Sequence, residues 1–250
     1  EQKLQLYNFE NKIPYYLFSC IKIMKKNINN LLYELVILTP QNISDYLDDF
    51  PIRMNGDSEY SLKYRVDLLS SFILSKYGGL FLSPGTIIYK NINNIIDKIS
   101  NYDMVTFGSS KLEMNICDNK LYPNNYIIGC KKDSLYMKKY KELLLNQINN
   151  STPYSGLRIL PKILNSSDIK QLHCSCEYDG TIDYNNKLIG LDSLLGTYKI
   201  LFKNEQKLIF ISLPYDIMLK NTKYEWINLL NKDELLNSNI FLENILRIKE

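Results

Sequence analysis

Arginine is scarce in this chain: four of its 250 residues are Arg, against 26 Lys. Proteins that read nucleic acids depend on arginine forks that bind bases and phosphates through paired hydrogen bonds. The net charge of +3 adds no strong attraction for phosphate, so the sequence argues against nucleic acid as a partner. The chain also lacks any apolar run near the roughly 18 to 20 residues of a membrane span. Neither a membrane-spanning helix nor a secretory signal is therefore expected.

Histidine and paired cysteines are also rare. The five cysteines are an odd number without a C-x-x-C pair, which favours reduced thiols and a cytoplasmic or cytosol-facing location. The one histidine, His173, stands beside Cys174 and Cys176, but a structural zinc site needs a second ligand pair, which the sequence lacks. We therefore interpret His173 as a tolerated residue of an apolar strand.

Short apolar strands alternate with amphipathic helices along the first two thirds of the chain. This order predicts an α/β protein with a mostly parallel sheet flanked by helices, built as one domain over residues 1–250. After residue 170 the pattern changes to strand pieces and two terminal helices, which predicts a mixed C-terminal region. Strands are predicted at residues 4–9, 33–38, 80–82, 86–89, 103–107, 126–130, 171–175, 198–202 and 207–213, and helices at 17–24, 45–49, 58–76, 133–149 and 155–164, with a loop at 114–125.

The helix at 58–76 is the clearest element. Asp57 or Ser58 can cap its start, and Gly78-Gly79 ends it. The strand that follows is interrupted by the turn Ser83-Pro84-Gly85. Because α/β sheets place ligand chemistry at such strand ends, Ser83 and Gly85 are candidate substrate-binding residues.

Six segments of the chain go beyond a general α/β pattern: 20–27, 34–39, 42–46, Arg65-Val-Asp-Leu-Leu69, Lys76-Tyr-Gly-Gly-Leu-Phe-Leu82 and Thr86-Ile87. Together they resemble the capsular polysaccharide synthesis proteins and related DxD-motif sugar transferases, glycosyltransferase family 32 in the broad sense. The resemblance covers about residues 4 to 100 and is strongest from 60 to 90.

This resemblance implies a GT-A fold, with a Rossmann-type sheet that binds a nucleotide-sugar and a transfer that retains anomeric configuration. The donor half would span about residues 1–130 and the acceptor half about 131–250. In the family pattern an Asp before the Gly-Gly contacts the nucleotide, and it maps to Asp67. The Arg that commonly follows three residues later maps to Ser70, and Arg65 could partly replace it.

The metal motif is where the chain departs from the family pattern. The DxD carboxylates would fall at residues 83 and 85, where this chain has Ser83 and Gly85. Two carboxylates at i and i+2 hold Mn²⁺ or Mg²⁺ against the donor diphosphate, and Ser and Gly do not supply them. We therefore expect no metal bound by this turn and no cofactor.

Two functions remain open at this point. In the first, the chain is a transferase that acts on a glycan or protein acceptor in surface or capsule-type polysaccharide synthesis, and Arg65, Lys63 or Arg158 replaces the metal. In the second, it is a catalytically degenerate relative that binds nucleotide-sugars or glycans. Gly85 would let backbone N–H groups approach the phosphates.

Other candidate residues lie outside this segment. Asp179 and Asp183 sit in an acidic loop at 177–183, where a carboxylate could orient an acceptor hydroxyl, the alternative being a polar turn. Tyr7 and Phe9 close the first strand, where a nucleotide base could stack, or they are core aromatics. His173 could instead meet the donor diphosphate, as in some GT-A enzymes.

The helix near residue 20 offers a peripheral membrane contact. Tyr15, Tyr16 and Phe18, followed by Lys25 and Lys26, could rest on a membrane surface. The alternative is that this helix covers a sheet. Nothing in the sequence determines the oligomeric state.

Overall fold

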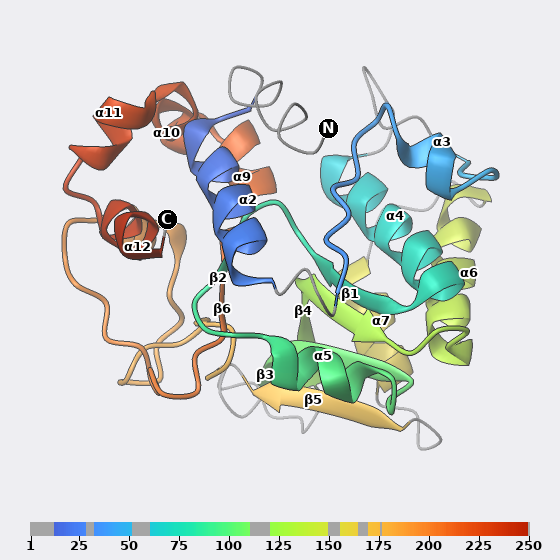
Figure 1. Cartoon of the computed structure of the whole chain (residues 1–250). Coiled ribbons are helices and arrows are strands. Elements are labelled where there is room, and N and C mark those ends of the chain that lie inside the picture. The colour runs from blue at the N-terminus through green and yellow to red at the C-terminus, as the bar shows by residue number, and fades with distance from the viewer. Residues whose placement is uncertain are drawn as a thin grey trace. The chain divides into compact units, whose positions relative to one another are not determined.

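A computed structural model describes residues 13–28, 33–51, 61–110, 121–149, 156–164, 170–175 and 177–249 of the chain (Figure 1). The protein forms two compact units, each assembled from separate stretches of sequence. The sheet unit contains residues 34–82 and 93–175, and the helix-rich unit contains residues 1–33, 83–92 and 176–250.

The sheet unit is built on a four-stranded sheet in the order β1-β4-β3-β5. Its strands are β1 (Gly79–Leu82), β3 (Met104–Ser110), β4 (Leu121–Cys130) and β5 (Gln171–Ser175). β4 pairs antiparallel with both β1 and β3, and only β3 and β5 run parallel. The prediction of a mostly parallel sheet is therefore wrong for the described residues, because the antiparallel strand β4 lies between β1 and β3.

The described residues of the sheet unit form helices α3 (Ile43–Tyr46), α4 (Leu62–Tyr77), α5 (Asn93–Ile99), α6 (Leu135–Asn149) and α7 (Gly156–Leu164). Helix α4 begins where the Ser61 hydroxyl accepts a hydrogen bond from the Tyr64 N–H at 3.2 Å, which satisfies one unpaired donor of the first turn. The helix ends at Gly78, whose φ of 71° favours glycine. A Cβ at Gly78 would also lie 2.5 Å from the Lys132 nitrogen.

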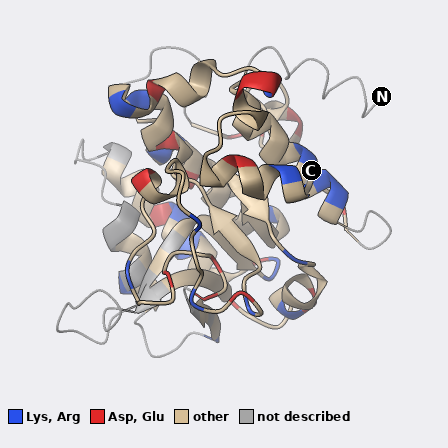
Figure 2. Cartoon of the chain, turned by 90° about the vertical axis from the view of Figure 1, so that its left-hand side faces the viewer, with Lys and Arg blue, Asp and Glu red and all other residues tan. Residues whose placement is uncertain are grey.

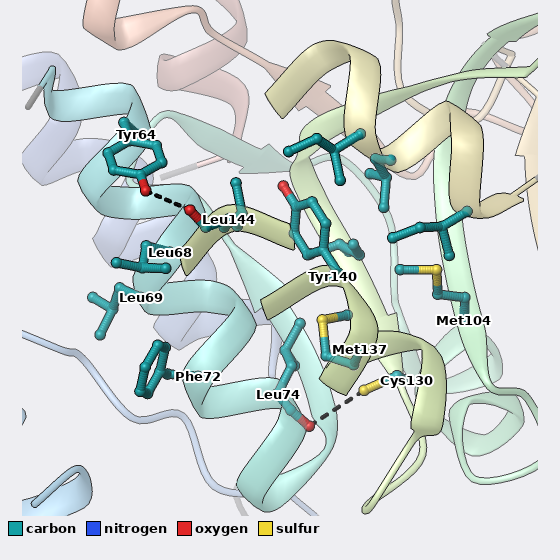
Figure 3. Close-up of a cluster of buried hydrophobic side chains, with 14 of the residues drawn as sticks. Tyr64, Leu68, Leu69, Phe72, Leu74, Met104, Cys130, Met137, Tyr140 and Leu144 are labelled. Carbon is teal, nitrogen blue, oxygen red and sulfur yellow. Dashed lines mark hydrogen bonds between the residues drawn. The ribbon is translucent and has the colours of Figure 1, made fainter. Parts of the chain in front are cut away.

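The core of the sheet unit lies between α4, α6, α7 and the sheet (Figure 3). Leu68, Leu144 and Leu160 are fully buried in it. Two polar contacts cross this core: the Tyr64 hydroxyl donates to the Leu144 carbonyl at 2.8 Å, and the Cys130 thiol donates to the Leu74 carbonyl at 3.4 Å. Helix α4 is thereby fixed at both of its ends, which positions the side chains on its first turns.

The helix-rich unit pairs β2 (Thr86–Ile88) with β6 (Phe210–Ser212) in an antiparallel ladder. Helix α2 (Tyr15–Asn27) belongs to the same unit and buries Tyr16, Cys20 and Ile23. The remaining helices of this unit follow the loop region in chain order: α8 (Leu191–Leu194), α9 (Tyr215–Lys220), η2 (Thr222–Tyr224), α10 (Glu225–Leu229), α11 (Lys232–Leu236) and α12 (Phe241–Lys249).

Some predicted strands differ from the observed elements. Residues 33–38 are extended but form no strand with any described residue, and residues 198–202 contribute a single bridge, between Phe202 and Asp183. The predicted loop at 114–125 is part of β4 from Leu121 onward. The predicted strand at 4–9 lies outside the described residues. The helices predicted between residues 17 and 164, and the strands β1, β2, β3 and β5, are found close to their predicted positions. Helix α5 was not predicted, and the region of the two predicted terminal helices contains several short helices.

Candidate functional site

A buried charged cluster lies on α4 and β4 of the sheet unit. Asp67 is 1% exposed, and its carboxylate accepts a hydrogen bond from the Lys63 ammonium at 2.8 Å, one helical turn earlier. The Asn125 amide of β4 donates to the other carboxylate oxygen of Asp67 at 3.3 Å. A carboxylate removed from water is stabilised by such paired and hydrogen-bonded partners. The cluster thus joins groups that are 58 residues apart in sequence.

Lys63 is the cation of this cluster and has a second contact. Its ammonium lies 4.2 Å from the centroid of the Tyr126 ring, a distance at which a cation is attracted to the face of the ring. The Lys63 side chain is 14% exposed. An ammonium carries three N–H donors, so the hydrogen bond to Asp67 leaves Lys63 with donors for a ligand.

Asn125 adds a second kind of hydrogen-bond acceptor to the cluster, the oxygen of its side-chain amide. It is 4% exposed, and its side-chain oxygen is buried with no hydrogen-bond partner in the described part of the chain. Buried polar atoms in folded proteins are nearly always hydrogen-bonded. An orphaned acceptor beside Asp67 is therefore a position that a ligand hydroxyl or N–H would satisfy.

The negative charge of Asp67 affects the pKa of a tyrosine in the adjoining core. Burial, and after it the negative charge of Asp67 and the phenol of Tyr64, raises the pKa of the Tyr140 phenol well above its ordinary value. Tyr140 is 2% exposed. Its hydroxyl therefore stays neutral over the whole physiological range.

The other residues that the sequence associated with Asp67 have different surroundings. Arg65 is half-buried on α4, and a spacing of two helical residues turns its side chain about 200° away from that of Asp67. Ser70, at the position where the family commonly has Arg, is 2% exposed and donates to the Asp67 carbonyl at 2.8 Å. The lysine that pairs with Asp67 meets it on a buried face of α4.

The turn Ser83–Gly85 is packed against β6 within the helix-rich unit. Ser83 is fully buried, and its hydroxyl lies 3.2 Å from that of Thr86. The Thr86 N–H donates to the Ser83 carbonyl at 3.0 Å, and the Leu213 N–H donates to the Gly85 carbonyl at 2.9 Å. A Cβ at Gly85 would lie 2.8 Å from the Leu213 carbonyl oxygen. Glycine is therefore required by close packing at this turn.

These contacts do not fit a metal of the DxD type. A carboxylate at position 85 would displace the backbone of Leu213, and the hydroxyl of Ser83 is already engaged with Thr86. Among the described residues, no group of three or more His, Cys, Asp or Glu side chains could hold a metal ion. We therefore derive no step of the chemistry through a metal at this turn.

Asp179 is as buried as Asp67, at 1% exposed. Its carboxylate accepts hydrogen bonds from the N–H and from the hydroxyl of Thr181. The adjacent Tyr178 carbonyl accepts from the N–H groups of Ile209 and Phe210, both at 2.9 Å. This loop is thereby tied to the start of β6.

Asp183 stabilises the turn formed by the residues that follow it. One of its carboxylate oxygens accepts from the N–H groups of Asn185 and Lys187, both at 2.8 Å. Such short-range bonds are typical of a polar turn, which was the structural alternative for this loop. Asp179 and Asp183 thus share a loop on β6 and lie in the helix-rich unit, whereas Asp67 and Arg65 lie in the sheet unit.

The remaining candidates are described in part or not at all. Arg158 lies on α7 and His173 on β5, and their side chains lie outside the described part of the structure. Tyr7 and Phe9 lie outside the described residues altogether.

The aromatic residues of α2 are core residues. Tyr15, Tyr16 and Phe18 are 7%, 0% and 6% exposed. The three rings are therefore buried inside the protein, as the alternative of a helix that covers a sheet would have them. No helix in the described part of the chain combines the length and the apolar composition that crossing a membrane requires.

Asn125 and Tyr126 are members of the cluster that the sequence did not reveal. Asn125 was assigned to the end of a loop and Tyr126 to the start of a strand. A signal was present in the Asn-Asn-Tyr segment at the start of an otherwise apolar strand. Its relation to Asp67, however, depends on the antiparallel pairing that places β4 next to β1.

The fold and the cluster define a mixed α/β protein with a buried, charged polar site on α4 and β4. The family model for capsular polysaccharide synthesis protein matches residues 9–164, well over half of the chain. The chain therefore belongs to the capsular polysaccharide synthesis protein family, which implies a role in making capsular polysaccharide. Neither a curated protein nor a solved structure matches the chain. The matched region contains the whole Asp67 cluster, while Asp179 and Asp183 lie beyond it.

Proposed function

We propose that the protein is a glycosyltransferase that moves a sugar from a nucleotide-sugar donor to a glycan or protein acceptor in capsular polysaccharide synthesis. The observation that carries this proposal is the buried Lys63–Asp67 pair, which lies inside the region matched by the family. Buried charged pairs are costly to form, and a functional role is one reason for the chain to keep this pair.

Lys63 is the residue we assign to the donor diphosphate. When the glycosidic bond to the donor breaks, negative charge develops on the departing nucleoside diphosphate, and a fixed cation stabilises that charge. Asp67 and the Tyr126 ring hold the Lys63 ammonium in place. This gives Lys63 the electrostatic role that a DxD-bound metal has in related enzymes. Arg65 and Arg158 remain further candidate cations.

Asn125 and Asp67 are the groups we assign to the nucleoside part of the donor. The Asn125 side-chain oxygen has no partner among the described residues, and a ribose hydroxyl is a donor of the right kind to satisfy it. Asp67 orients the Asn125 amide by accepting its N–H. Asp67 therefore acts on the nucleotide side of the site, as the family resemblance suggests.

The proposal is tested by hydrolysis of a panel of nucleotide-sugars, with Mn²⁺ and with a chelator. We expect at least one donor to be hydrolysed at a rate that survives chelation. Lys63→Met should lower that rate by about a hundredfold or more. The matched control is Lys139→Met, which removes an exposed lysine of α6 and should leave the rate unchanged. A panel in which no donor is either bound or hydrolysed would refute the proposal.

A second candidate function is that of a non-catalytic nucleotide-sugar or glycan-binding protein. It is favoured by the hydrogen bonds of Asp179 and Asp183 within their own loop, because these bonds occupy carboxylate oxygens that a general base would use. A ligand that binds the native state raises apparent thermal stability even when catalysis is lost. A donor that raises the melting temperature without being hydrolysed, with or without metal and acceptor, would therefore favour this second function.

A further inference from the structure

Two segments of the helix-rich unit lie side by side. The Tyr184 N–H donates to the Leu201 carbonyl at 2.9 Å, and the Lys203 N–H donates to the Ile182 carbonyl at 3.3 Å. Asp183 and Phe202 form a bridge between the segments. Residues 182–184 and 201–203 therefore lie next to each other, and the chain on either side of them carries further exposed side chains.

These two segments expose four large apolar side chains. Tyr198 is 86% exposed, Tyr184 is 60% exposed, and Leu188 and Leu201 are 53% and 51% exposed. We call these four residues, together with Lys187 and Lys199, the Tyr–Leu face. Single exposed apolar residues are ordinary, but a group of them on adjoining segments indicates an interaction site.

The backbone under the Tyr–Leu face is anchored. Ile182 is 1% exposed, and the ring of Phe202 packs 6.3 Å from that of Tyr89 and 6.1 Å from that of Phe241. The two segments are thus held by buried neighbours on their inner side. The exposed tyrosines and leucines therefore project from an anchored backbone.

The charge on this face is predominantly basic. Lys187 and Lys199 are exposed and form no ion pair with any described residue, and Lys203 lies at the edge of the face. Of the acids close in sequence, Asp183 is bound to backbone N–H groups of its own turn, and Glu205 accepts a hydrogen bond from the Tyr89 hydroxyl. Figure 2 shows basic and acidic residues interspersed over the described part of the chain.

We propose that the Tyr–Leu face binds the surface of an anionic lipid bilayer. Tyrosine suits the boundary of a membrane because its ring is apolar and its hydroxyl is polar. Exposed leucines gain free energy on leaving water for the acyl-chain boundary. Lysines add electrostatic attraction to anionic headgroups. All three features occur together on this face.

A second copy of the chain fits this surface less well. A symmetric contact uses the same face on both subunits, so it would bring Lys187 and Lys199 against a face of the same charge. An anionic membrane complements both the lysines and the apolar side chains. The inference is independent of the proposed transferase activity, because the face and the Asp67 cluster share no residue.

The test is co-sedimentation of the full chain with lipid vesicles. The vesicles contain either phosphatidylcholine alone or phosphatidylcholine with about 30% phosphatidylglycerol, a content chosen to give a negative surface potential. We expect binding to the anionic vesicles and little binding to the neutral ones. Binding should also weaken as salt is raised, because salt screens the lysines.

Matched variants test whether this face is responsible. Lys199→Glu/Leu201→Ser removes one lysine and one leucine of the face, and partition onto anionic vesicles should fall by about tenfold or more. Leu135→Ser/Lys139→Glu makes the same changes on α6, where both residues are exposed, and should bind like the parent. Thermal melts monitored by circular dichroism verify that both variants are folded.

Three outcomes would overturn the inference. The first is a parent protein that fails to sediment with anionic vesicles. The second is equal loss of binding in the face variant and the α6 control, which would mean that any lysine and leucine suffice. The third is a change of oligomeric state in the face variant, measured by sedimentation velocity, while vesicle binding is retained, which would assign the face to contact between copies.

Discussion

Asp67 and Asp179 are equally buried, each at 1% exposed, but they are satisfied in different ways. Asp179 accepts bonds from Thr181, two residues away, whereas Asp67 is held by Lys63 and by Asn125 of a different element. A carboxylate that accepts hydrogen bonds from its own turn stabilises that turn. A carboxylate that gathers a cation and an amide from separate elements positions those groups, and the cluster still contains an unsatisfied acceptor. Depth of burial alone therefore does not distinguish a functional carboxylate from a structural one.

The largest effect is expected at the turn of the helix-rich unit, where Gly85→Asp would supply one of the two carboxylates that the resemblance to DxD-motif transferases places there. Gly85→Asp places a Cβ 2.8 Å from the Leu213 carbonyl and buries a charge, so we expect a loss of about 3 kcal/mol or more in unfolding free energy. Urea denaturation measures the change. Gly190→Ala is the control, because nothing lies within 4 Å of a Cβ at that position, and it should cost less than about 1 kcal/mol. A stable Gly85→Asp protein whose melting temperature rises with Mn²⁺ would show that the turn can accept the motif.

The next effect concerns the cluster on α4. Asp67→Asn removes the charge that holds Lys63, so we expect about 2 kcal/mol of lost stability and donor binding weaker by about 1 to 3 kcal/mol. A double-mutant cycle with Lys63→Met separates the pair from its surroundings, and calorimetry measures donor affinity. Additive effects of the two substitutions would mean that the pair is not coupled. Unchanged donor affinity in a folded Asp67→Asn protein would make Asp67 structural, like Asp179.

A smaller effect is expected from pH, because Tyr140 lies in the core beside Asp67. Its raised pKa means that the folded protein resists ionising this phenol. The corresponding stability is complete below the ordinary tyrosine pKa of about 10 and is lost as pH rises above that value. Tyr140→Phe should therefore reduce the alkaline loss of stability in urea titrations at several pH values. Tyr198→Phe, at an exposed position, should leave the alkaline profile as it is in the parent.

The smallest effect is expected at Asp183. Asp183→Asn keeps an oxygen that can accept the N–H groups of Asn185 and Lys187, so stability should change by less than about 1 kcal/mol. Donor affinity should be unchanged. The same substitution tests the catalytic candidate in the 177–183 loop, because turnover with an acceptor present would collapse if this carboxylate were the general base. Such a collapse would remove the distinction drawn here between the two carboxylate regions.

The sequence predicted local elements well because local signals determine them. Helix α4 was expected at 58–76 and runs from Leu62 to Tyr77, since its apolar spacing and the Gly78-Gly79 stop act over a few residues. The strand directions were predicted wrongly. The short apolar segment predicted at 126–130 has the same pattern in either direction, and the place of β4 between β1 and β3 is decided by long-range pairing.

Only part of the candidate site could be predicted from the sequence. Asp67 was identified from the family pattern and is indeed buried, and the lack of carboxylates at 83 and 85 was evident from the residues. The packing of Gly85 on Leu213 could not be anticipated, because the two residues are distant in sequence and meet only across β2 and β6. Asn125 was missed for the same reason.

The pairing of β2 with β6 also constrains the order in which the protein can assemble. The strands are more than 120 residues apart, so during synthesis β2 emerges long before its partner. Until residues 210–212 are made, the backbone groups of Thr86–Ile88 lack this ladder, and unpaired strand edges promote aggregation. The sheet unit contains no residue beyond 175, so its own elements are available earlier. Truncation before β6 should therefore yield a protein prone to aggregate, and the closing contacts of the helix-rich unit belong to the slow, non-local stage of folding.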